Sequence, residues 1–153
     1  MSRVIFMCGP AGSGKSTVAR RLEGEGMTRL SVDQEAWRRG VRVMPLPTEL
    51  RRQIREEQRA RLVDLVAAGV DVVLDYAFWS RQEREDYRAL LRPLGVEPET
   101  VYLATPREVA LARVRGRRTS DGDDYALSND VAAAYFDGFE PPTVNEGPLT
   151  IIR

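Results

Sequence analysis

The sequence predicts an α/β fold of one domain, residues 1–153, in three layers: a five-stranded parallel sheet with helices on both faces. Three observations predict it. Short apolar runs typical of buried strands alternate with segments whose apolar residues recur at helical spacing. A glycine-rich stretch joins the first expected strand to the first expected helix. The chain has 153 residues, 42% of them hydrophobic, which is close to the length of one domain.

The expected strands are apolar runs bounded by glycine, proline or polar residues. The first (RVIFMC) and the third (VDVVLD) are nearly continuous apolar runs, as in parallel strands buried on both faces, and the second (TRLSVD) alternates. The last is a short run near the end of the sequence. In chain order the strands are residues 3–8, 28–33, 70–75, 100–104 and 149–152.

The helices are expected between the strands, and several of their starts carry recognisable signals. Thr48 is a candidate N-cap, Ser80 and Glu83 form a candidate capping box, and Pro106 suits a first helical turn. Two loops are expected, at 40–47 and at the polar stretch 119–126. The expected helices are residues 15–24, 34–39, 48–69, 80–92, 106–115 and 129–139.

Composition excludes several kinds of chemistry. The chain has no histidine, which excludes histidine general bases, histidine zinc ligands and Ser-His-Asp triads. Its formal net charge is zero, with 23 basic and 23 acidic residues, whereas nucleic-acid-binding proteins usually have a basic excess. A nucleic-acid partner is therefore possible but not favoured, and the sequence leaves the oligomeric state open.

The sequence favours a cytoplasmic protein with no membrane partner. No apolar run approaches the ~18 residues of a membrane helix. The apolar stretch from Val4 to Cys8 is too short for the core of a signal peptide. Cys8 is the only cysteine, so no internal disulfide forms, which fits a reducing compartment.

The strongest motif is the stretch GPAGSGKS at residues 9–16, which fits the phosphate-binding P-loop pattern G-x-x-x-x-G-K-[ST] at a strand–helix junction. Its glycines let successive backbone N–H groups approach phosphate oxygens, and the start of the helix favours the same anion. The motif predicts a nucleoside triphosphate and Mg²⁺ as ligands. The expected nucleotide-binding residues are Gly9, Ala11, Gly12, Ser13, Gly14, Lys15, Ser16 and Thr17.

Lys15 and Ser16 have separate expected roles within this motif. Lys15 would reach the β- and γ-phosphates, and the Ser16 hydroxyl would ligate Mg²⁺. Of the 23 basic residues, only Lys15 is lysine and all the others are arginine. A chain that uses arginine elsewhere but lysine here indicates a need for a compact ammonium group, which a guanidinium does not replace.

The chain resembles the small P-loop kinases of the polynucleotide-kinase, zeta-toxin and chloramphenicol-phosphotransferase group over nearly its whole length. The resemblance rests on the P-loop, on Asp33 at the end of the second expected strand, and on three segments, LDYAFWSRQER, ARVRGRR and FEPP. It implies a P-loop kinase fold, ATP as the donor, and a small lid at about 117–127 whose arginines clamp phosphates. Arg113 and Arg117, four residues apart, would take this role, with Arg118 as a competitor; a solvated basic face is the alternative.

Two acidic residues are candidates for the acceptor side. Asp33 and Asp75 end apolar runs, so both are expected at the carboxyl edge of the sheet beside the P-loop. The resemblance implies that Asp33 contacts the acceptor hydroxyl as the catalytic base. It also implies that Asp75 binds a substrate hydroxyl or the water shell of Mg²⁺. A helix N-cap is the alternative interpretation of either residue.

Aromatic and basic side chains near these aspartates are further candidates for substrate binding. Trp37 and Trp79 each follow an aspartate by four residues and either line an acceptor pocket or pack in the core. Arg81 and Arg84 either hold an anionic acceptor or pair with neighbouring glutamates.

The favoured function is an ATP-dependent phosphotransferase acting on a hydroxyl of a small molecule, a nucleotide sugar or a nucleic-acid 5′ end. Two alternatives stay open. One is a P-loop hydrolase that acts as a switch, although the chain has no N/T-K-x-D segment for selecting guanine. The other is a nucleotide-binding module without catalysis.

Overall fold

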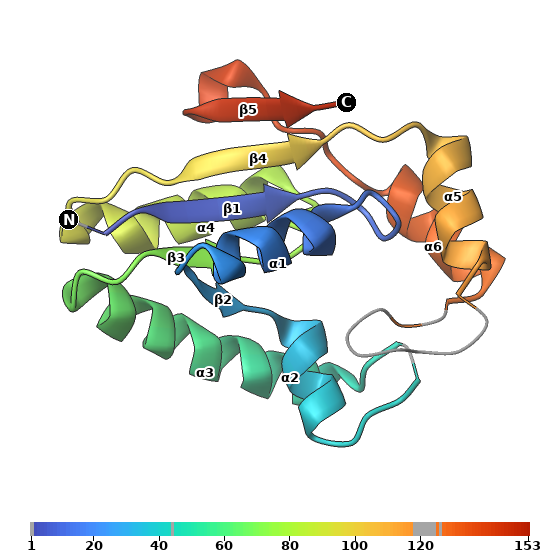
Figure 1. Cartoon of the computed structure of the whole chain (residues 1–153), viewed down its shortest axis with the longest axis horizontal. Helices are drawn as coiled ribbons and strands as arrows, with labels where there is room; N and C mark the ends of the chain where they lie inside the picture. The colour runs from blue at the N-terminus through green and yellow to red at the C-terminus, as the bar shows by residue number, and fades with distance from the viewer. Residues whose placement is uncertain (1, 44, 118–124, 126) are drawn as a thin grey trace.

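The computed structural model of the chain describes residues 2–43, 45–117, 125 and 127–153. Strands and helices alternate along the chain, and all the expected strands are present (Figure 1). The third and second strands are shorter than the sequence predicts, while the last matches its expected bounds. The strands are β1 Val4–Cys8, β2 Thr28–Leu30, β3 Val72–Leu74, β4 Glu99–Leu103 and β5 Leu149–Ile152.

The helices begin and end within a few residues of their expected bounds. Two short 3₁₀ turns, η1 Arg92–Leu94 and η2 Val144–Glu146, add to them. Within the described residues, no helix has both the length and the apolar character needed to cross a bilayer. The helices are α1 Lys15–Gly24, α2 Val32–Arg38, α3 Thr48–Ala67, α4 Arg81–Leu91, α5 Arg107–Arg115 and α6 Asn129–Asp137.

The sheet is parallel throughout and confirms the predicted five-stranded architecture. Its strand order is β2-β3-β1-β4-β5, with β1 in the centre. Val4 pairs in register with Val72 of β3, and Ile5 pairs with Glu99 of β4. Because the chain turns to one side of β1 for β2 and β3 and to the other side for β4 and β5, the order reverses at β1. The carboxyl end of β1 is therefore the place where such sheets bind ligands.

Two apolar clusters cover the two faces of the sheet. Val4, Phe6 and Cys8 of β1 point to one face, into a cluster with buried residues of α2, α3 and α4. Ile5 and Met7 point to the other face, into a cluster with residues of α1 and β4. Burial on both sides explains why the sequence of β1 is a continuous apolar run rather than an alternating one.

Two helix starts differ from the sequence-based prediction. β2 ends at Leu30, and Ser31 caps α2 by accepting a hydrogen bond from the backbone N–H of Gln34 at 3.1 Å. Asp33 therefore lies in the first turn of α2 and does not end a strand, because the serine two residues earlier is a good N-cap. Thr48 is likewise the first residue of α3, after an N-cap at Pro47 without a side-chain bond.

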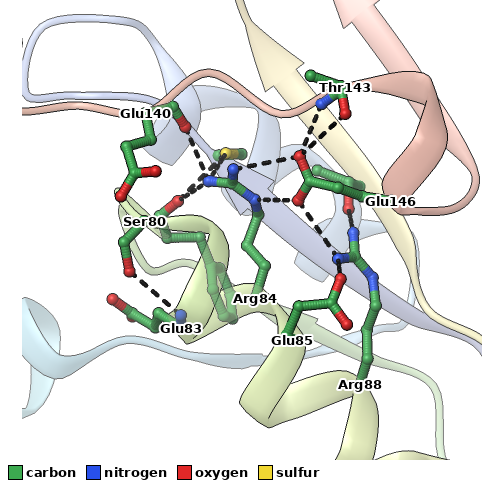
Figure 2. A network of polar contacts seen from close by, with 11 residues as sticks. Ser80, Glu83, Arg84, Glu85, Arg88, Glu140, Thr143 and Glu146 are labelled. Atoms are coloured by element: carbon green, nitrogen blue, oxygen red, sulfur yellow. Dashed lines mark hydrogen bonds and ion pairs between the residues drawn. The ribbon is translucent and has the colours of Figure 1, made fainter.

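The segment after α6 is held against α4 by a buried ion-pair network (Figure 2). Arg84 Nε lies 2.8 Å from Glu146 Oε1, and Arg88 Nη1, one turn further along α4, lies 3.4 Å from the same oxygen. The backbone N–H of Thr143 donates to Glu146 Oε2 at 2.7 Å, and Arg88 Nη2 donates to Thr100 Oγ1 at 3.1 Å. The side chains of Arg84 and Glu146 are 0% and 2% exposed, so the charges are shielded from water.

Glu146 is expected to make the fold sensitive to acid. Burial by itself raises the pKa of Glu146, but hydrogen bonds from Arg84 and from the Thr143 backbone outweigh it and hold the pKa below its usual 4.5. A carboxyl group with a lowered folded-state pKa stabilises the fold above its unfolded-state pKa. That stabilisation disappears as the pH falls through the folded-state pKa. We therefore expect the free energy of unfolding to fall as the pH drops below 4.5.

The contribution of Glu146 is measured by urea unfolding between about pH 7 and about pH 3, since the slope against pH counts protons taken up on unfolding. Glu146→Gln should lower stability at neutral pH and flatten the acid slope. Glu97→Gln, at an exposed position, is the matched control and should leave the slope unchanged. Equal acid slopes for Glu146→Gln and the native chain would contradict the expectation.

Candidate functional site

The P-loop lies between β1 and α1, as the motif predicts. Gly12 and Gly14 have φ angles of 82° and 95°, in the left-handed region that glycine adopts without strain. Ser13 N–H donates to the Pro10 carbonyl at 3.1 Å and closes the turn. α1 begins at Lys15, and its N-cap, Gly14, makes no side-chain bond to the first turn. The first N–H groups of α1 are therefore left for an anion.

The P-loop also packs closely against α5. Gly12 faces the helix backbone, and a Cβ built on it would lie 2.2 Å from the Ala110 carbonyl oxygen. Arg113 Nη1 donates to the Gly12 carbonyl at 3.2 Å, and Thr105 Oγ1 donates to the Ser13 carbonyl at 2.8 Å. These contacts fix the loop against the segment that carries the candidate arginines.

Gly12→Ala is expected to weaken ATP binding by on the order of tenfold, the cost of strain at a constrained backbone position. The new Cβ would overlap helix backbone, which moves less easily than a side chain, so the P-loop would have to shift. Gly26→Ala is the matched control: its φ is also positive, at 111°, but a Cβ there meets nothing within 4 Å. ATP titration calorimetry compares the two variants, and equal affinities would contradict the expectation.

A small cavity of about 320 Å³ opens beside the P-loop. The two candidate arginines, Arg113 in the last turn of α5 and Arg117 just after it, both line this cavity. The structure thus brings them together with the phosphate-binding residues. The described lining residues are Gly12, Gly14, Lys15, Ser16, Thr17, Arg113 and Arg117.

A second, larger cavity of about 420 Å³ shares Lys15 with the first, because this residue lines both. Its lining comes from the P-loop, the start of α2, the loop before α3, α3 itself, the segment after β3, and α6. The lining includes Asp33, Asp75 and Trp79, as expected for an acceptor pocket. The described lining residues are Pro10, Ala11, Lys15, Val32, Asp33, Pro45, Leu46, Arg51, Arg55, Asp75, Tyr76, Ala77, Trp79, Ala134, Tyr135, Gly138 and Phe139.

Asp75 is buried and already paired. Arg29 Nε and Nη2 lie 3.0 Å and 2.5 Å from Asp75 Oδ2, and each side chain is 1% exposed. Arg29 thus balances the charge of Asp75. The other carboxylate oxygen, Oδ1, is buried and makes no hydrogen bond within the described residues. Asp75 thus lines the larger cavity with one carboxylate oxygen paired and the other buried.

Trp37 and Arg81 lie elsewhere. Trp37 is not among the described residues that line the larger cavity, because its ring packs edge-on against Tyr125, with centroids 5.8 Å apart. The Arg42 guanidinium covers the same ring at 3.9 Å. Arg81 is exposed at the start of α4 and is not among the described lining residues of either cavity.

Arg84 also differs from both sequence interpretations. It neither faces an acceptor nor pairs with a neighbouring glutamate of α4; it is buried and pairs with Glu146, 62 residues along the chain. Glu83 pairs instead with Arg55 of α3 at 2.7 Å, so only the Ser80 half of the expected capping box forms.

Sequence reasoning missed several residues of the larger cavity, among them Arg51, Arg55, Tyr135 and Phe139. Arg51 and Arg55 are four apart on α3 and thus share a helix face, but so do many arginines of this chain. Tyr135 and Phe139 come from α6 and the residues that follow it, which the sequence shows only as an apolar helical stretch. Arg118 and most of the expected lid at 117–127 lie outside the described residues.

Comparison with known proteins agrees with this fold. A family described as an AAA domain matches residues 4–142. No curated protein matches the chain in sequence. A Chloroflexus aurantiacus J-10-fl structure, provisionally described as a kinase, has 18% identity and a TM-score of 0.75 over 99% of this chain and 87% of that one.

Two solved kinases are similar as well. A gluconokinase from Sinorhizobium meliloti 1021 has 19% identity and a TM-score of 0.66, covering 98% of this chain and 81% of that one. The APS kinase of Mycobacterium tuberculosis, solved with AMPPNP and APS, has 17% identity and a TM-score of 0.62, covering 98% and 88%. At these identities the likeness shows the fold.

Proposed function

Since the chain belongs to the AAA domain family, and its fold is that of P-loop kinases, we propose that it is an ATP-dependent phosphotransferase. It would move the γ-phosphoryl group of Mg-ATP to a hydroxyl group of an acceptor. ATP would bind at the P-loop and the smaller cavity, and the acceptor would bind in the larger cavity.

One observation carries this proposal: Lys15 lines both cavities. A nucleotide held by the P-loop places its terminal phosphate near the P-loop lysine. A second cavity that shares this lysine and has a carboxylate in its wall is what a transfer reaction needs. A hydrolase needs only a water molecule at this position, whereas a cavity of about 420 Å³ has the volume of a small-molecule site.

The proposed chemistry uses this chain's residues as follows. The acceptor hydroxyl oxygen attacks the γ-phosphorus, the bond from that phosphorus to the β–γ bridging oxygen breaks, and ADP leaves. The hydroxyl proton passes to the carboxylate of Asp33. Lys15, Arg113 and Arg117 would offset the negative charge on the transferring group, because all three line the smaller cavity.

The oxygen donors beside the P-loop suit Mg²⁺. Ser16 lines the smaller cavity, and one buried oxygen of Asp75 makes no hydrogen bond to any residue that the structure describes. Mg²⁺ prefers such oxygen ligands and keeps several waters, so Ser16 would bind it directly and Asp75 through water. The ion would supply charge neutralisation on the phosphate oxygens.

The lining of the larger cavity favours a small organic acceptor. Tyr76, Trp79, Tyr135 and Phe139 place four aromatic rings in a wall that also holds Asp33. Mostly apolar walls with a few polar groups are typical of small-molecule sites. A nucleotide sugar or the 5′ end of a nucleic acid would have to enter by its terminal hydroxyl.

The test is ADP release from Mg-ATP, alone and with pools of hydroxyl acceptors: nucleosides, 5′-OH oligonucleotides, sugars and nucleotide sugars, and aromatic alcohols. Release that rises with one pool, together with a phosphorylated product in that pool, supports the proposal. Release that no pool changes favours a hydrolase. ATP binding without any release favours a binding module, and either result would contradict phosphoryl transfer to these acceptors.

A further inference from the structure

The segment after β3 holds a strained turn beside the proposed acceptor cavity. Phe78 has a φ of 47° and is the one residue other than glycine with a positive φ in the described part of the chain. Its ring is buried, stacked on Phe6 with centroids 4.4 Å apart and edge-on to Tyr87 at 5.3 Å. A bulky residue keeps such a backbone only where its surroundings enforce it, and such residues gather at functional sites.

The neighbours of Phe78 form the wall of the cavity. Ala77 and Trp79 both line it. The Ala77 carbonyl accepts the N–H of Gly9, the first P-loop residue, at 3.1 Å, and the Trp79 carbonyl accepts the N–H of Glu140 at 2.7 Å. The strained turn is thus bonded on one side to the P-loop and on the other to the segment after α6.

One guanidinium group holds this turn. Arg84 Nη1 donates to the Phe78 carbonyl at 2.6 Å and to the Glu140 carbonyl at 2.9 Å (Figure 2). Cys8, at the end of β1, donates its S–H to the same Phe78 carbonyl at 3.5 Å. Burial raises the pKa of Cys8 to about 12, so the thiol keeps its proton. The end of β1, the strained turn and the segment after α6 therefore meet at Arg84.

A contribution to stability does not by itself explain why an Arg84–Glu146 ion pair is buried here. A buried ion pair loses much of its attraction to desolvation, and apolar residues of similar size often stabilise a core as well or better. What an apolar residue does not supply is directional bonding to two carbonyl groups at once. Glu146 holds the other edge of the guanidinium, at 2.8 Å, and thereby fixes its orientation.

We infer that Arg84, oriented by Glu146, is a positioning residue that sets the wall of the acceptor cavity against the P-loop. By holding Phe78 and Glu140 it fixes Ala77 and Trp79 relative to the γ-phosphate of bound ATP. The effect of Arg84 on catalysis rests on the proposed function. Its effect on the position of the cavity wall can be tested by a measurement that needs no enzymatic activity.

The first test is amide hydrogen exchange by NMR on Arg84→Lys, which keeps the charge but loses the forked geometry. We expect the Glu140 and Gly9 amides, which bond to either side of the strained turn, to exchange on the order of tenfold faster. The Val73 amide, in the middle of β3, should not change. Arg88→Lys is the matched control, because Arg88 pairs with Glu146 but has no bond to the turn; its Glu140 and Gly9 amides should exchange as in the native chain.

If Arg84→Lys does not fold, Glu146→Gln provides the same test, because it removes the charge that orients Arg84. Unchanged exchange of the Glu140 and Gly9 amides in the folded variant would overturn the inference. Equal acceleration in Arg88→Lys would also overturn it, because the effect would then be general loosening of the core.

The second test uses whichever acceptor the ADP-release assay identifies. Arg84→Lys should raise the KM for that acceptor roughly tenfold through misplacement of the cavity wall, with the dissociation constant for ATP within about twofold. Arg88→Lys should change neither. An equal rise in the KM for the acceptor and in the dissociation constant for ATP would overturn the inference. Absence of any transfer activity in the native chain would instead count against the proposed function, while the exchange result would still decide the positioning.

Discussion

Lys15→Ala is expected to lower ADP formation from Mg-ATP by roughly a thousandfold, in the range seen when a preorganised charge at a developing anion is removed. Among the described lining residues, Lys15 alone is common to both cavities, so it lies where we propose that donor and acceptor meet. ATP binding should weaken as well, because the ammonium group would contact the β- and γ-phosphates in both the ground state and the transition state. Single-turnover ADP release and ATP titration measure the two effects separately.

Lys15→Arg makes the prediction sharper. A guanidinium group is larger and planar, and the space beside Lys15 already holds Arg113. We expect the arginine variant to lose nearly as much activity as the alanine variant, although it keeps the charge. Arg21→Ala, at an exposed position of α1, is the control and should behave as the native chain. Near-native turnover in Lys15→Arg would show that charge suffices and that the single lysine reflects composition only.

The sequence predicted the parallel sheet and the P-loop because both depend on local patterns. Continuous apolar runs such as β1 and glycines at fixed offsets in the P-loop are properties of neighbouring residues. The family match and the similar solved folds confirm the resemblance to P-loop kinases. The sequence analysis placed Asp33 at the end of the second strand, and this was wrong, because Asp33 lies in the first turn of α2. The residues between Leu30 and Asp33 are compatible with either a strand end or a helix start.

The partners of the buried charges and the lining of the larger cavity could not be predicted, because they depend on contacts between residues that are far apart in the sequence. Arg84 reaches Glu146 across 62 residues, and no spacing in the sequence marks that pair. Trp37 and Trp79 have equivalent offsets from an aspartate, yet only Trp79 lines the cavity. Trp37 instead packs against Tyr125, which lies far along the chain. The pairing of Asp75 with Arg29 was likewise hidden, because strand arginines usually face solvent.

Asp33→Asn is expected to lower transfer to the acceptor by about a hundredfold or more, as for a lost general base, while ATP affinity stays nearly unchanged. The amide has nearly the shape of the carboxylate but is not a base for the hydroxyl proton. Asp33 lines the larger cavity and is not among the residues of the smaller one, so nucleotide contacts should persist. Asp64→Asn, at an exposed position of α3, controls for the general loss of one negative charge. Acceptor-dependent ADP release measures the rate of transfer, and ATP titration measures the affinity for ATP.

Asp75→Asn separates the two carboxylates of the cavity. It would remove the carboxylate charge from the buried Arg29–Asp75 pair, and breaking such a pair costs about 3–5 kcal/mol of stability. Asp33 is half-buried in the first turn of a helix, so its variant should unfold at nearly the native urea concentration. Loss of transfer in a stable Asp33→Asn protein would therefore be a chemical effect and not a loss of structure. Full transfer in that variant would move the base to another group of the larger cavity. Asp75, one of whose oxygens has no hydrogen bond within the described part of the chain, would be the next candidate.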